Sequence, residues 1–468
     1  MALKKELTLL PFTSKFIDMH NKKLVLVLLV LVWGAAFSQG PPDKNSLMGN
    51  RFLTFNTVIR VNQIEVSRNR NVGQDERALH TPARVAAFRQ AVAEGFPGGK
   101  MTWAFSWLAL NDTTYNYREI RRMVTEYHYK YGDEVTFIPG AYFANAYNSV
   151  EQVNKDIHDA LKLISDMVGY GYRPLSIVAG FLSAKNQQYL ADKEGIHVCQ
   201  GNIWSQYSID NQDGDGAVCY PYYPSREHFC KPAQNSRDFI DCVNLDGWST
   251  DFLAARRAGF AEGFNSRLSV GPIETIGRYG TETGLKSMMH VTSIHFDNGY
   301  KLNGFAWVTN CWELCLPYDP ANLKAWLTQI RNRWPDVQMI TQGAFGMIWR
   351  RHYKSNKFDY RFVERGSGIG GSDANNEIRW FMNKDFRLAL LRDWEKNTPA
   401  KVIDFTSYRQ PAAEPDTMTR KWSLMGLINQ KNTRPQDKPV ALDALPAKAR
   451  ALIARHYPYL FEKTKPVK

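Results

Sequence analysis

The sequence predicts an α/β fold, a (β/α)7-8 barrel followed by a smaller C-terminal α+β domain. From about residue 52 to about residue 345, apolar strand-like runs alternate with helical segments, which is typical of parallel sheets. Strands are expected near residues 55, 103, 136, 177, 197, 240, 270, 305 and 340. Seven to nine strands in about 300 residues favour a closed or nearly closed barrel.

The first strand is expected at Phe52–Val66, where the residues are β-branched and partly alternate in polarity. Further strands are expected at Met101–Leu110, Val135–Pro139, Leu175–Phe181 and Ile196–Gln200. Helices are expected at Thr81–Glu94, Tyr117–Tyr131 and Val150–Val168, the last with an apolar stripe along one face. These segments, with those that follow, make up a predicted barrel domain of residues 39–345.

A long insertion rich in Tyr, Pro and Cys, residues 204–238, interrupts the alternation. A loop of this length is usually functional or disordered, and its cysteines argue that it is held in place. Beyond residue 346 the pattern changes, and we expect a C-terminal α+β domain over 346–468. It contains strand-like pieces in Glu377–Arg392 and Lys401–Tyr408 and a short helix at Ala447–His456.

The N-terminal region has the features of a targeting segment. Residues 19–38 combine a short basic stretch, the apolar run Leu24–Trp33 and a small-x-small site at Ala36-Phe37-Ser38, which together predict a secretory signal peptide. Residues 1–18 precede Met19 and are interpreted as an upstream start artefact. The alternative is an N-terminal membrane anchor, but the apolar run is short for a span. We therefore expect an exported protein, periplasmic or secreted, with no stable membrane anchor.

The formal net charge is +13, with 44% hydrophobic and 22% charged residues. This composition is ordinary for a globular protein. In an exported protein, excess positive charge suggests an acidic polysaccharide as readily as a nucleic acid, and a solvated basic surface is the plainer interpretation. Lys and Arg form no dense run, so we predict no nucleic-acid partner. The oligomeric state is left open.

Six cysteines, an even number, favour disulfides in an oxidising compartment. Six cysteines allow fifteen pairings, and the sequence does not choose among them. A zinc site is the rival interpretation, but the chain has no C-x-x-C pair.

Two glutamates are the first catalytic candidates. A strand at Leu268–Ile273 would end at Glu274, a helix would cover Thr281–His295, and a second strand at Asn303–Thr309 would lead to Glu313. Because ligands bind where parallel strands end, both acids should lie at the mouth of the barrel. Two carboxylates are what glycosidic cleavage needs, one to protonate the leaving oxygen and one to attack or to activate water. Alternatively, each is a strand-end acid in a salt bridge.

Other side chains could complete the site. Asp246 is a further candidate acid, and His295 a candidate hydrogen-bonding or acid–base partner. Flat aromatic faces that could stack on sugar rings, and polar groups beside them, are expected at Trp107, Trp204, Trp248, Trp312, Asn111, Asp112 and Asn310. His290 and His295 are five residues apart, which does not place them together as metal ligands. The sequence predicts neither a metal nor a cofactor.

Two further motifs have plainer interpretations. Asn211-x-Asp213-x-Asp215-Gly216 opens like a calcium loop, but its twelfth position is Tyr222, so a polar turn is favoured. Gly366-x-Gly368-x-x-Gly371 satisfies the dinucleotide pattern without a surrounding Rossmann unit and is expected to be a turn.

Three stretches carry a resemblance to a known family: Gly171–Gln234, GPIETIG at 271–277 and NGFAWVTNCWEL at 303–314. They resemble an exported bacterial family of unknown function, described as a candidate glycoside hydrolase or deacetylase. That family is similar in fold to glycoside hydrolase family 57 and to polysaccharide deacetylase (β/α)7 barrels. The deacetylases' paired aspartates and two-histidine metal set has no match, because no histidine box follows Ser106–Asp112.

The resemblance and the residues together predict a glycoside hydrolase that acts on an oligo- or polysaccharide through Glu313 and Glu274. One alternative is a metal-dependent polysaccharide deacetylase. Another is a non-catalytic glycan-binding protein on an inactivated barrel.

Overall fold

The computed structural model describes residues 43–68, 70–202, 216–247, 251–261, 272–314, 319–428 and 438–462. Contacts divide the chain into Met1–Ser46 and Leu47–Lys468. The parallel strands and the C-terminal sheet therefore belong to one unit, the second.

Strand β1 (Arg51–Ile59) is the centre of a parallel sheet. It pairs with β4 (Thr102–Phe105), β9 (Ala306–Cys311) and β10 (Val337–Ile340), and β4 pairs with β5 (Glu134–Phe137). Strands β6 (Ile177–Val178), β7 (Val198–Asn202) and β8 (Val243–Asp246) form a second parallel sheet. A hydrogen bond of 2.9 Å from Asn56 Nδ2 to Gly201 O joins the two. The pairings of the described strands thus give two parallel sheets and not one closed barrel.

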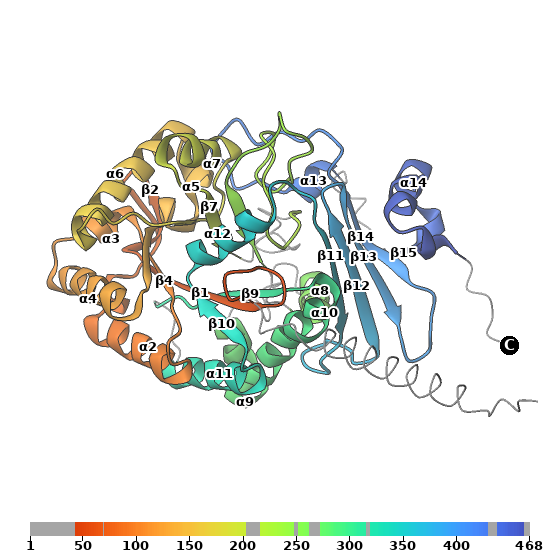
Figure 1. Ribbon diagram of the computed structural model, residues 1–468, viewed down its shortest axis with the longest axis horizontal. Coiled ribbons are helices and arrows are strands. Elements are labelled where there is room, and N and C mark those ends of the chain that lie inside the picture. Colours follow the sequence, from red (N-terminus) through yellow and green to blue (C-terminus); the bar gives the residue numbers. More distant parts are fainter. Residues whose placement is uncertain are drawn as a thin grey trace, which may run out of the picture. The chain divides into compact units, whose positions relative to one another are not determined.

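Helices cover the outer faces of the parallel strands (Figure 1). The longer ones are α2 (Pro82–Gly95), α4 (Tyr115–Tyr131), α6 (Val150–Val168), α9 (Pro272–Ser293) and α11 (Pro320–Arg333). Ser149 caps α6 by accepting the Gln152 N–H, and the helix buries one apolar stripe against the sheet. The shorter helices are α3 (Trp107–Asn111), α5 (Ala144–Tyr147), α7 (Ala184–Tyr189), α8 (Phe252–Ala261), α10 (Tyr300–Asn303) and α13 (Leu424–Ile428).

Helix α12 (Gln342–His352) lies across the N-terminal ends of the parallel strands. Gln342 N donates to Thr102 Oγ1 at 3.0 Å, and Gly343 N donates to Glu134 Oε2 at 2.9 Å, at the first residues of β4 and β5. Phe345 stacks on Trp307 inside, with ring centroids 4.9 Å apart. A Cβ on Gly346 would come within 2.4 Å of the Val198 side chain, so this close packing requires glycine. The helix closes this end of the strands.

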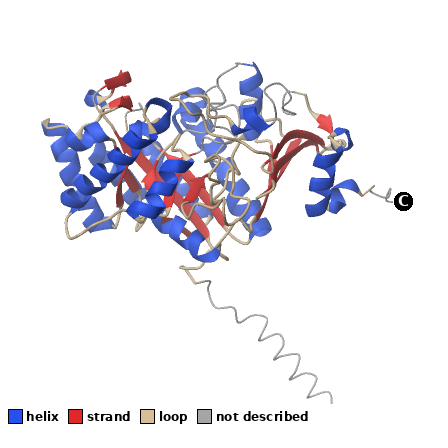
Figure 2. Ribbon diagram, turned by 90° about the horizontal axis from the view of Figure 1, so that it is seen from above, coloured by secondary structure: helices blue, strands red, loops and turns tan. Residues whose placement is uncertain are grey.

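The C-terminal part is an antiparallel sheet, in the order β11 (Asp359–Arg365), β12 (Asn376–Asn383), β13 (Phe386–Asp393), β14 (Lys401–Ser407) and β15 (Val440–Ala441). One face packs against α14 (Ala447–His456), through residues such as Leu388 and Ile453. The other face packs toward the parallel strands and the insertion, where Trp380 contacts Phe252 with centroids 4.6 Å apart. Figure 2 shows the sheet between the parallel strands and the helix near the C-terminus.

Several expected elements lie at the predicted bounds, and three differ. Helices α6 and α14 cover the predicted residues. The predicted strand Phe52–Val66 instead breaks after Ile59, and β2 (Asn62–Val66) forms a hairpin with β3 (Arg70–Asp75). The predicted strand Met101–Leu110 stops at Ser106, whose hydroxyl caps α3.

The third difference concerns the predicted strand before Glu274. Pro272 and Ile273, its last residues, lie in the first turn of α9, and Glu274 follows them in that helix. Proline suits a first helical turn, because the N–H it lacks would have no partner there. Residues 268–271 lie outside the described residues.

Five of the six cysteines are described, namely Cys199, Cys219, Cys230, Cys242 and Cys311, and no disulfide joins any two of these five, so the predicted disulfides are not seen among them. The predicted signal peptide, Trp204, Trp248, Asp213, Asp215 and Cys315 lie outside the described residues. Across the described part of the chain, no helix is both long and apolar enough to cross a bilayer. The glycines at 366–371 form the turn between β11 and β12.

Candidate active site

A group of polar side chains lies where β1, β5 and β9 end. Arg60 follows β1 and makes two hydrogen bonds to Glu76, Nε to Oε2 at 2.7 Å and Nη2 to Oε1 at 2.8 Å. Its Nη2 also donates to Glu313 Oε2 at 3.0 Å, two residues beyond β9. The Tyr142 hydroxyl, from the loop after β5, lies 2.8 Å from Cys311 Sγ. We call Arg60, Glu76, Tyr142, Cys311 and Glu313 the Arg60 cluster.

The two carboxylates of the cluster differ in their surroundings. Glu76 is 4% exposed, and although burial alone would raise its pKa, His80 and Arg60 beside it lower the pKa to about 2. Its charge therefore balances that of Arg60. Glu313 is 24% exposed and shares the same guanidinium. The cluster thus presents one fixed, accessible carboxylate at the strand ends.

Tyr142 closes one side of the cluster. Burial raises the pKa of its hydroxyl well above the ordinary value, and Cys311 and Glu313 add to the effect. The Arg60 guanidinium carbon lies 5.8 Å from the centre of its ring. Tyr142 therefore remains neutral and can donate or accept a hydrogen bond.

Backbone strain gathers at the same ends of the strands. Ala141 and Tyr142 after β5, Phe181 after β6 and Gln200 in β7 all have positive φ, at 52°, 90°, 37° and 76°. Such angles cost free energy in residues other than glycine and are common at functional sites. Positive φ also occurs elsewhere, at Tyr170 and Cys219 for example, so the strain supports this end only as a candidate site.

Glu65 is a buried acid close to the cluster. Burial raises its pKa to about 7, against the lowering effects of a hydrogen bond from Ser106, the Leu108 N–H and the charge of Arg60. The Ser106 hydroxyl donates to Oε1 at 2.5 Å, and the Leu108 N–H donates to Oε2 at 3.2 Å. Because both oxygens bind the start of α3 and the side chain is buried, we assign Glu65 a positioning role.

Among the predicted acids, Glu313 belongs to the cluster. Glu274 is in the first turn of α9 and not at a strand end. Asp246 ends β8 opposite Asn202 and is 4% exposed. Burial raises the pKa of Cys219, and the charge of Asp246 adds to this rise, so Asp246 lies close to the insertion.

His295 and Trp312 lie away from the cluster. His295 is fully buried and stacks on Tyr220, and its neighbour Phe296 accepts a hydrogen bond from Arg51, at the start of β1. Nine residues of strand separate Arg51 from Arg60, about 30 Å at the rise of a β-strand, so His295 does not share this site. Trp312 is fully buried and packs on Trp326 of α11, at 6.0 Å, because alternation turns its side chain outward.

The other predicted binding residues have structural contacts. Trp107 is half-buried in the first turn of α3, and the Arg68 guanidinium covers its ring at 3.6 Å. Asn111 Nδ2 donates to Trp107 O at 2.8 Å, Asp112 accepts the Thr114 N–H at 2.8 Å, and Asn310 is buried in β9. Of these, Trp107, Asn111 and Asp112 lie on the strand-end side.

No three His, Cys, Asp or Glu side chains among the described residues are grouped as ligands for a metal ion. The described residues therefore contain no ready set of ligands for the metal of a deacetylase.

Sequence reasoning missed Arg60, Glu76 and Tyr142. Arg60 was hidden within a β-branched run taken for one strand, and Glu76 reaches it only because the β2–β3 hairpin folds back. The turn at Gly140 is a sequence signal that could have marked the loop, but the positive φ of Tyr142 has none.

The parallel sheets, with a charged cluster at their carboxyl ends, define an α/β protein whose candidate site lies at the strand ends. The chain belongs to the family described as a domain of unknown function with solved structure, DUF3863, which matches residues 45–382. A second domain of unknown function with solved structure, DUF3864, matches residues 387–460. No curated protein matched the chain.

One solved structure is similar over nearly the whole chain. It is a candidate glycoside hydrolase/deacetylase from Parabacteroides distasonis, with 50% identity, a TM-score of 0.83, and coverage of 89% of this chain and 100% of that one. A GH57 branching enzyme from Thermococcus kodakaraensis is 10% identical, covering 69% of this chain and 74% of that one, with a TM-score of 0.42. A peptidoglycan deacetylase from Bacillus subtilis is 10% identical, covering 65% and 94%, with a TM-score of 0.32.

Proposed function

We propose that this protein is an exported carbohydrate-active enzyme, a glycoside hydrolase whose accessible carboxylate is Glu313. The observation that carries the proposal is the hydrogen bond of 3.0 Å from Arg60 to Glu313, which fixes a partly exposed acid at the strand ends. The name of the Parabacteroides distasonis relative, at 50% identity, supports action on carbohydrates. The expected substrate is an oligo- or polysaccharide.

The chemistry assigns Glu313 the role of nucleophile or general base. Positive charge develops on the sugar in the transition state of glycosidic cleavage, and a carboxylate held beside it lowers the barrier. Arg60 fixes the orientation of Glu313, while Glu76 balances the positive charge of Arg60. Tyr142 is placed to donate a hydrogen bond to a substrate hydroxyl.

Glycosidic cleavage also needs an acid that protonates the leaving oxygen. Glu274 is our first candidate for this acid, with Asp246 as the second. Their exchange for amide residues tests each role separately, because loss of the acid slows substrates with poor leaving groups much more than activated aryl glycosides.

The test is product analysis with the mature chain from Gln39. The protein is incubated with a broad panel of glycans, with and without EDTA, and new reducing ends and acetate are both measured. We expect chelator-resistant reducing ends, and Glu313→Gln should lower their rate by about 100- to 10,000-fold. Glu119→Gln is the matched control, because Glu119 on α4 is also 24% exposed and also pairs with an arginine, Arg122.

Three outcomes would contradict the proposal. Acetate release that EDTA abolishes would identify a metal-dependent deacetylase, whose ligands would have to include residues beyond those described. Glycan binding without any turnover, unchanged in Glu313→Gln, would identify a non-catalytic glycan-binding protein. Equal loss of activity in Glu313→Gln and Glu119→Gln would show that the effect is not specific to the cluster.

A further inference from the structure

A pocket of about 310 Å³ lies away from the Arg60 cluster, between the insertion and the C-terminal sheet. Three segments far apart in the sequence line it: Ala233–Ser236 of the insertion together with Phe239 just after it, the loop 354–357 after α12, and Lys384 in the turn between β12 and β13. Its volume is at the lower end of the range of about 300–1,000 Å³ for small-ligand sites, enough for about one or two sugar rings.

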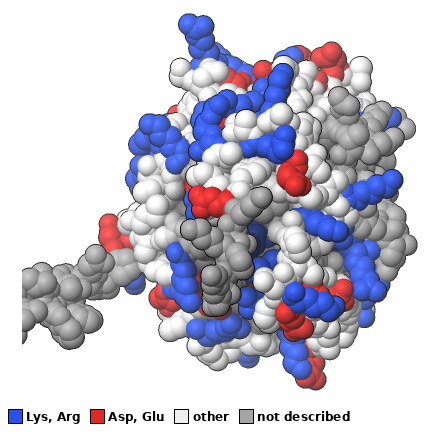
Figure 3. All heavy atoms as spheres, turned by 90° about the vertical axis from the view of Figure 1, so that its right-hand side faces the viewer, with Lys and Arg blue, Asp and Glu red and all other residues white. Residues whose placement is uncertain are grey.

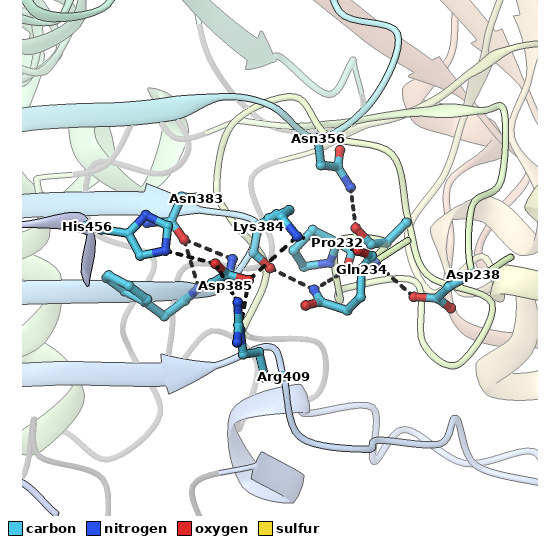
Figure 4. A network of polar contacts seen from close by, with 11 residues as sticks. Pro232, Gln234, Asp238, Asn356, Asn383, Lys384, Asp385, Arg409 and His456 are labelled. Carbon is cyan, nitrogen blue, oxygen red and sulfur yellow. Dashed lines mark hydrogen bonds and ion pairs between the residues drawn. The ribbon is translucent and has the colours of Figure 1, made fainter. Parts of the chain in front are cut away.

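Buried polar groups hold the wall of the pocket in one arrangement (Figure 4). Asn356 is buried, and its Nδ2 donates to Tyr223 O at 2.8 Å and to Ala233 O at 3.1 Å. Gln234 Nε2 donates to Lys384 O at 2.7 Å, and Asp238 accepts the Gln234 N–H at 3.0 Å. The insertion is thereby joined to both other segments, so the pocket is formed before any ligand arrives.

Asp385, the acid next to the pocket, is already hydrogen-bonded to other side chains. Asp385 follows Lys384 and accepts hydrogen bonds from Arg409 Nε at 3.0 Å and His456 Nε2 at 2.8 Å (Figure 4). Burial alone would raise its pKa, but the hydrogen bonds from Arg409 and His456 lower it. Asp385 Oδ1 lies 3.8 Å from Lys384 Nζ, too far for a strong hydrogen bond.

The charge that lines the pocket is positive throughout. Lys354, Lys357 and Lys384 belong to the lining, and none of the lining residues is acidic. Lys354 and Lys357 are exposed, and their side-chain ammonium groups have no hydrogen-bond or ion-pair partner among the described residues. Elsewhere Lys and Arg are mixed with Asp and Glu, as Figure 3 shows for the face over the C-terminal sheet. Lys384 is paired with Asp385 at 3.8 Å, so Lys354 and Lys357 are the two lining cations that have no acidic partner among the described residues.

One wall is aromatic. Phe239 lines the pocket and is held by Tyr223, with ring centroids 4.5 Å apart. The apolar face of a sugar ring packs well on such a ring, whereas a bare inorganic anion gains nothing from it. Ser236, Ser355 and Asn235 add short polar groups at the rim.

We propose that this pocket is a binding site for an anionic saccharide, a sugar that carries a carboxylate or a sulfate group, outside the catalytic site. The lysines would bind the anionic group and Phe239 the sugar ring. The choice of a saccharide rests on the proposed function, and the charge of the ligand rests on the pocket alone. Such a site would hold an acidic polysaccharide on the enzyme while the Arg60 cluster acts on another part of the chain.

The experiment measures binding of three matched trisaccharides by calorimetry at low ionic strength: galacturonic acid, neutral galactose and sulfated galactose. The full protein should bind one or both acidic sugars at least about 10-fold more tightly than the neutral one. Lys354→Met/Lys357→Met should abolish that preference. Lys162→Met/Lys193→Met, which removes the same charge from exposed positions, should preserve it. The uronate and the sulfate arms show which anionic group is preferred.

Two more variants distinguish saccharide binding in this pocket from binding of a bare anion and from binding at the Arg60 cluster. Phe239→Leu should lower the affinity for the trisaccharides and leave the weak binding of inorganic sulfate unchanged. Glu313→Gln should bind as the wild type does, whatever its turnover. Equal affinity for neutral and acidic sugars would overturn the proposal, as would equal losses in both double-lysine variants. Loss of binding in Glu313→Gln alone would place the ligand at the Arg60 cluster instead. If acidic sugars bind in a lysine-dependent way but no glycan is cleaved, the proposed binding site stands and only the proposed hydrolase activity is rejected.

Discussion

Two of the arginines that bind carboxylates in this protein do so in opposite ways. Arg387 on β13 binds Asp404 on β14 at 2.6 Å, and both side chains are fully buried. Arg60 after β1 also binds a buried carboxylate, that of Glu76, but it has a second carboxylate partner, Glu313, that reaches solvent. The first pair is closed, and Arg387 also donates to Ala217 O at 2.7 Å, which joins the sheet to the insertion. The second is open to a ligand.

The backbone follows the same division only in part. Residues other than glycine with positive φ are found at Ala141, Tyr142, Phe181 and Gln200, at the ends of parallel strands. In the described strands and turns from β11 to β14, Asn397 alone has such an angle, and asparagine tolerates it in turns. Cys219 of the insertion, whose Sγ accepts a hydrogen bond from Arg387 at 3.3 Å, also has positive φ, at 61°. The contrast between the regions therefore rests on their charges, and we infer that the open pair serves chemistry and the closed pair support.

The largest expected effect comes from breaking the closed pair. Asp404→Asn leaves Arg387 buried without a balancing charge, and it should lower the free energy of unfolding by about 3–5 kcal/mol. Chemical denaturation followed by circular dichroism measures the change. Asp336→Asn, at the half-exposed pair with Arg51, should cost no more than about 1 kcal/mol. Similar losses in the two variants would refute the distinction between closed and exposed pairs.

The open cluster should respond to acid. The pKa of Glu76 is lowered to about 2 in the folded protein, below its ordinary value of 4.5. Its contribution to stability is therefore complete above pH 4.5 and is lost as the pH falls toward 2. Relative to Glu76→Gln, the wild type should lose roughly 1–3 kcal/mol over that interval. Denaturation curves at a series of pH values measure the difference, and a constant difference would contradict the assigned pairing.

The smallest effect tests the strain. Ala141 has φ at 52°, which glycine adopts at little cost, so Ala141→Gly should stabilise the fold by about 0.5–1 kcal/mol. Ala109→Gly, in the helix α3, should instead destabilise it by about 1 kcal/mol. Thermal unfolding of both variants shows whether each substitution raises or lowers the stability. Destabilisation by Ala141→Gly would mean that the left-handed turn is not strained.

Sequence reasoning found the elements whose signals are local. The helix α6 has a serine cap and a regular apolar stripe, and Glu313 follows a continuous apolar strand. Signals that depend on distant residues were missed. The partners of Arg60 lie 16 and 253 residues further along the chain. The strand predicted before Glu274 failed because a short apolar run that contains proline also suits the start of a helix.

The lysine-lined pocket shows the same limit. Lys354 and Lys357 are close in sequence, but Phe239 and Lys384 reach them only through the fold. The net charge of +13 is interpreted most plainly as a solvated basic surface, and it does not locate any binding site. Charge can be counted from the sequence, whereas its concentration at one place is a property of the structure.

The packing of α12 across the start of the parallel strands affects how a ligand could enter and leave. Phe345 stacks on Trp307, and Gly346 packs closely against Val198, so α12 covers the start of these strands. We therefore expect a ligand of the proposed site to enter and to leave at the opposite ends of the strands, beside the Arg60 cluster. Under the proposed function, product release and substrate binding would use the same side of the protein. We therefore expect product inhibition.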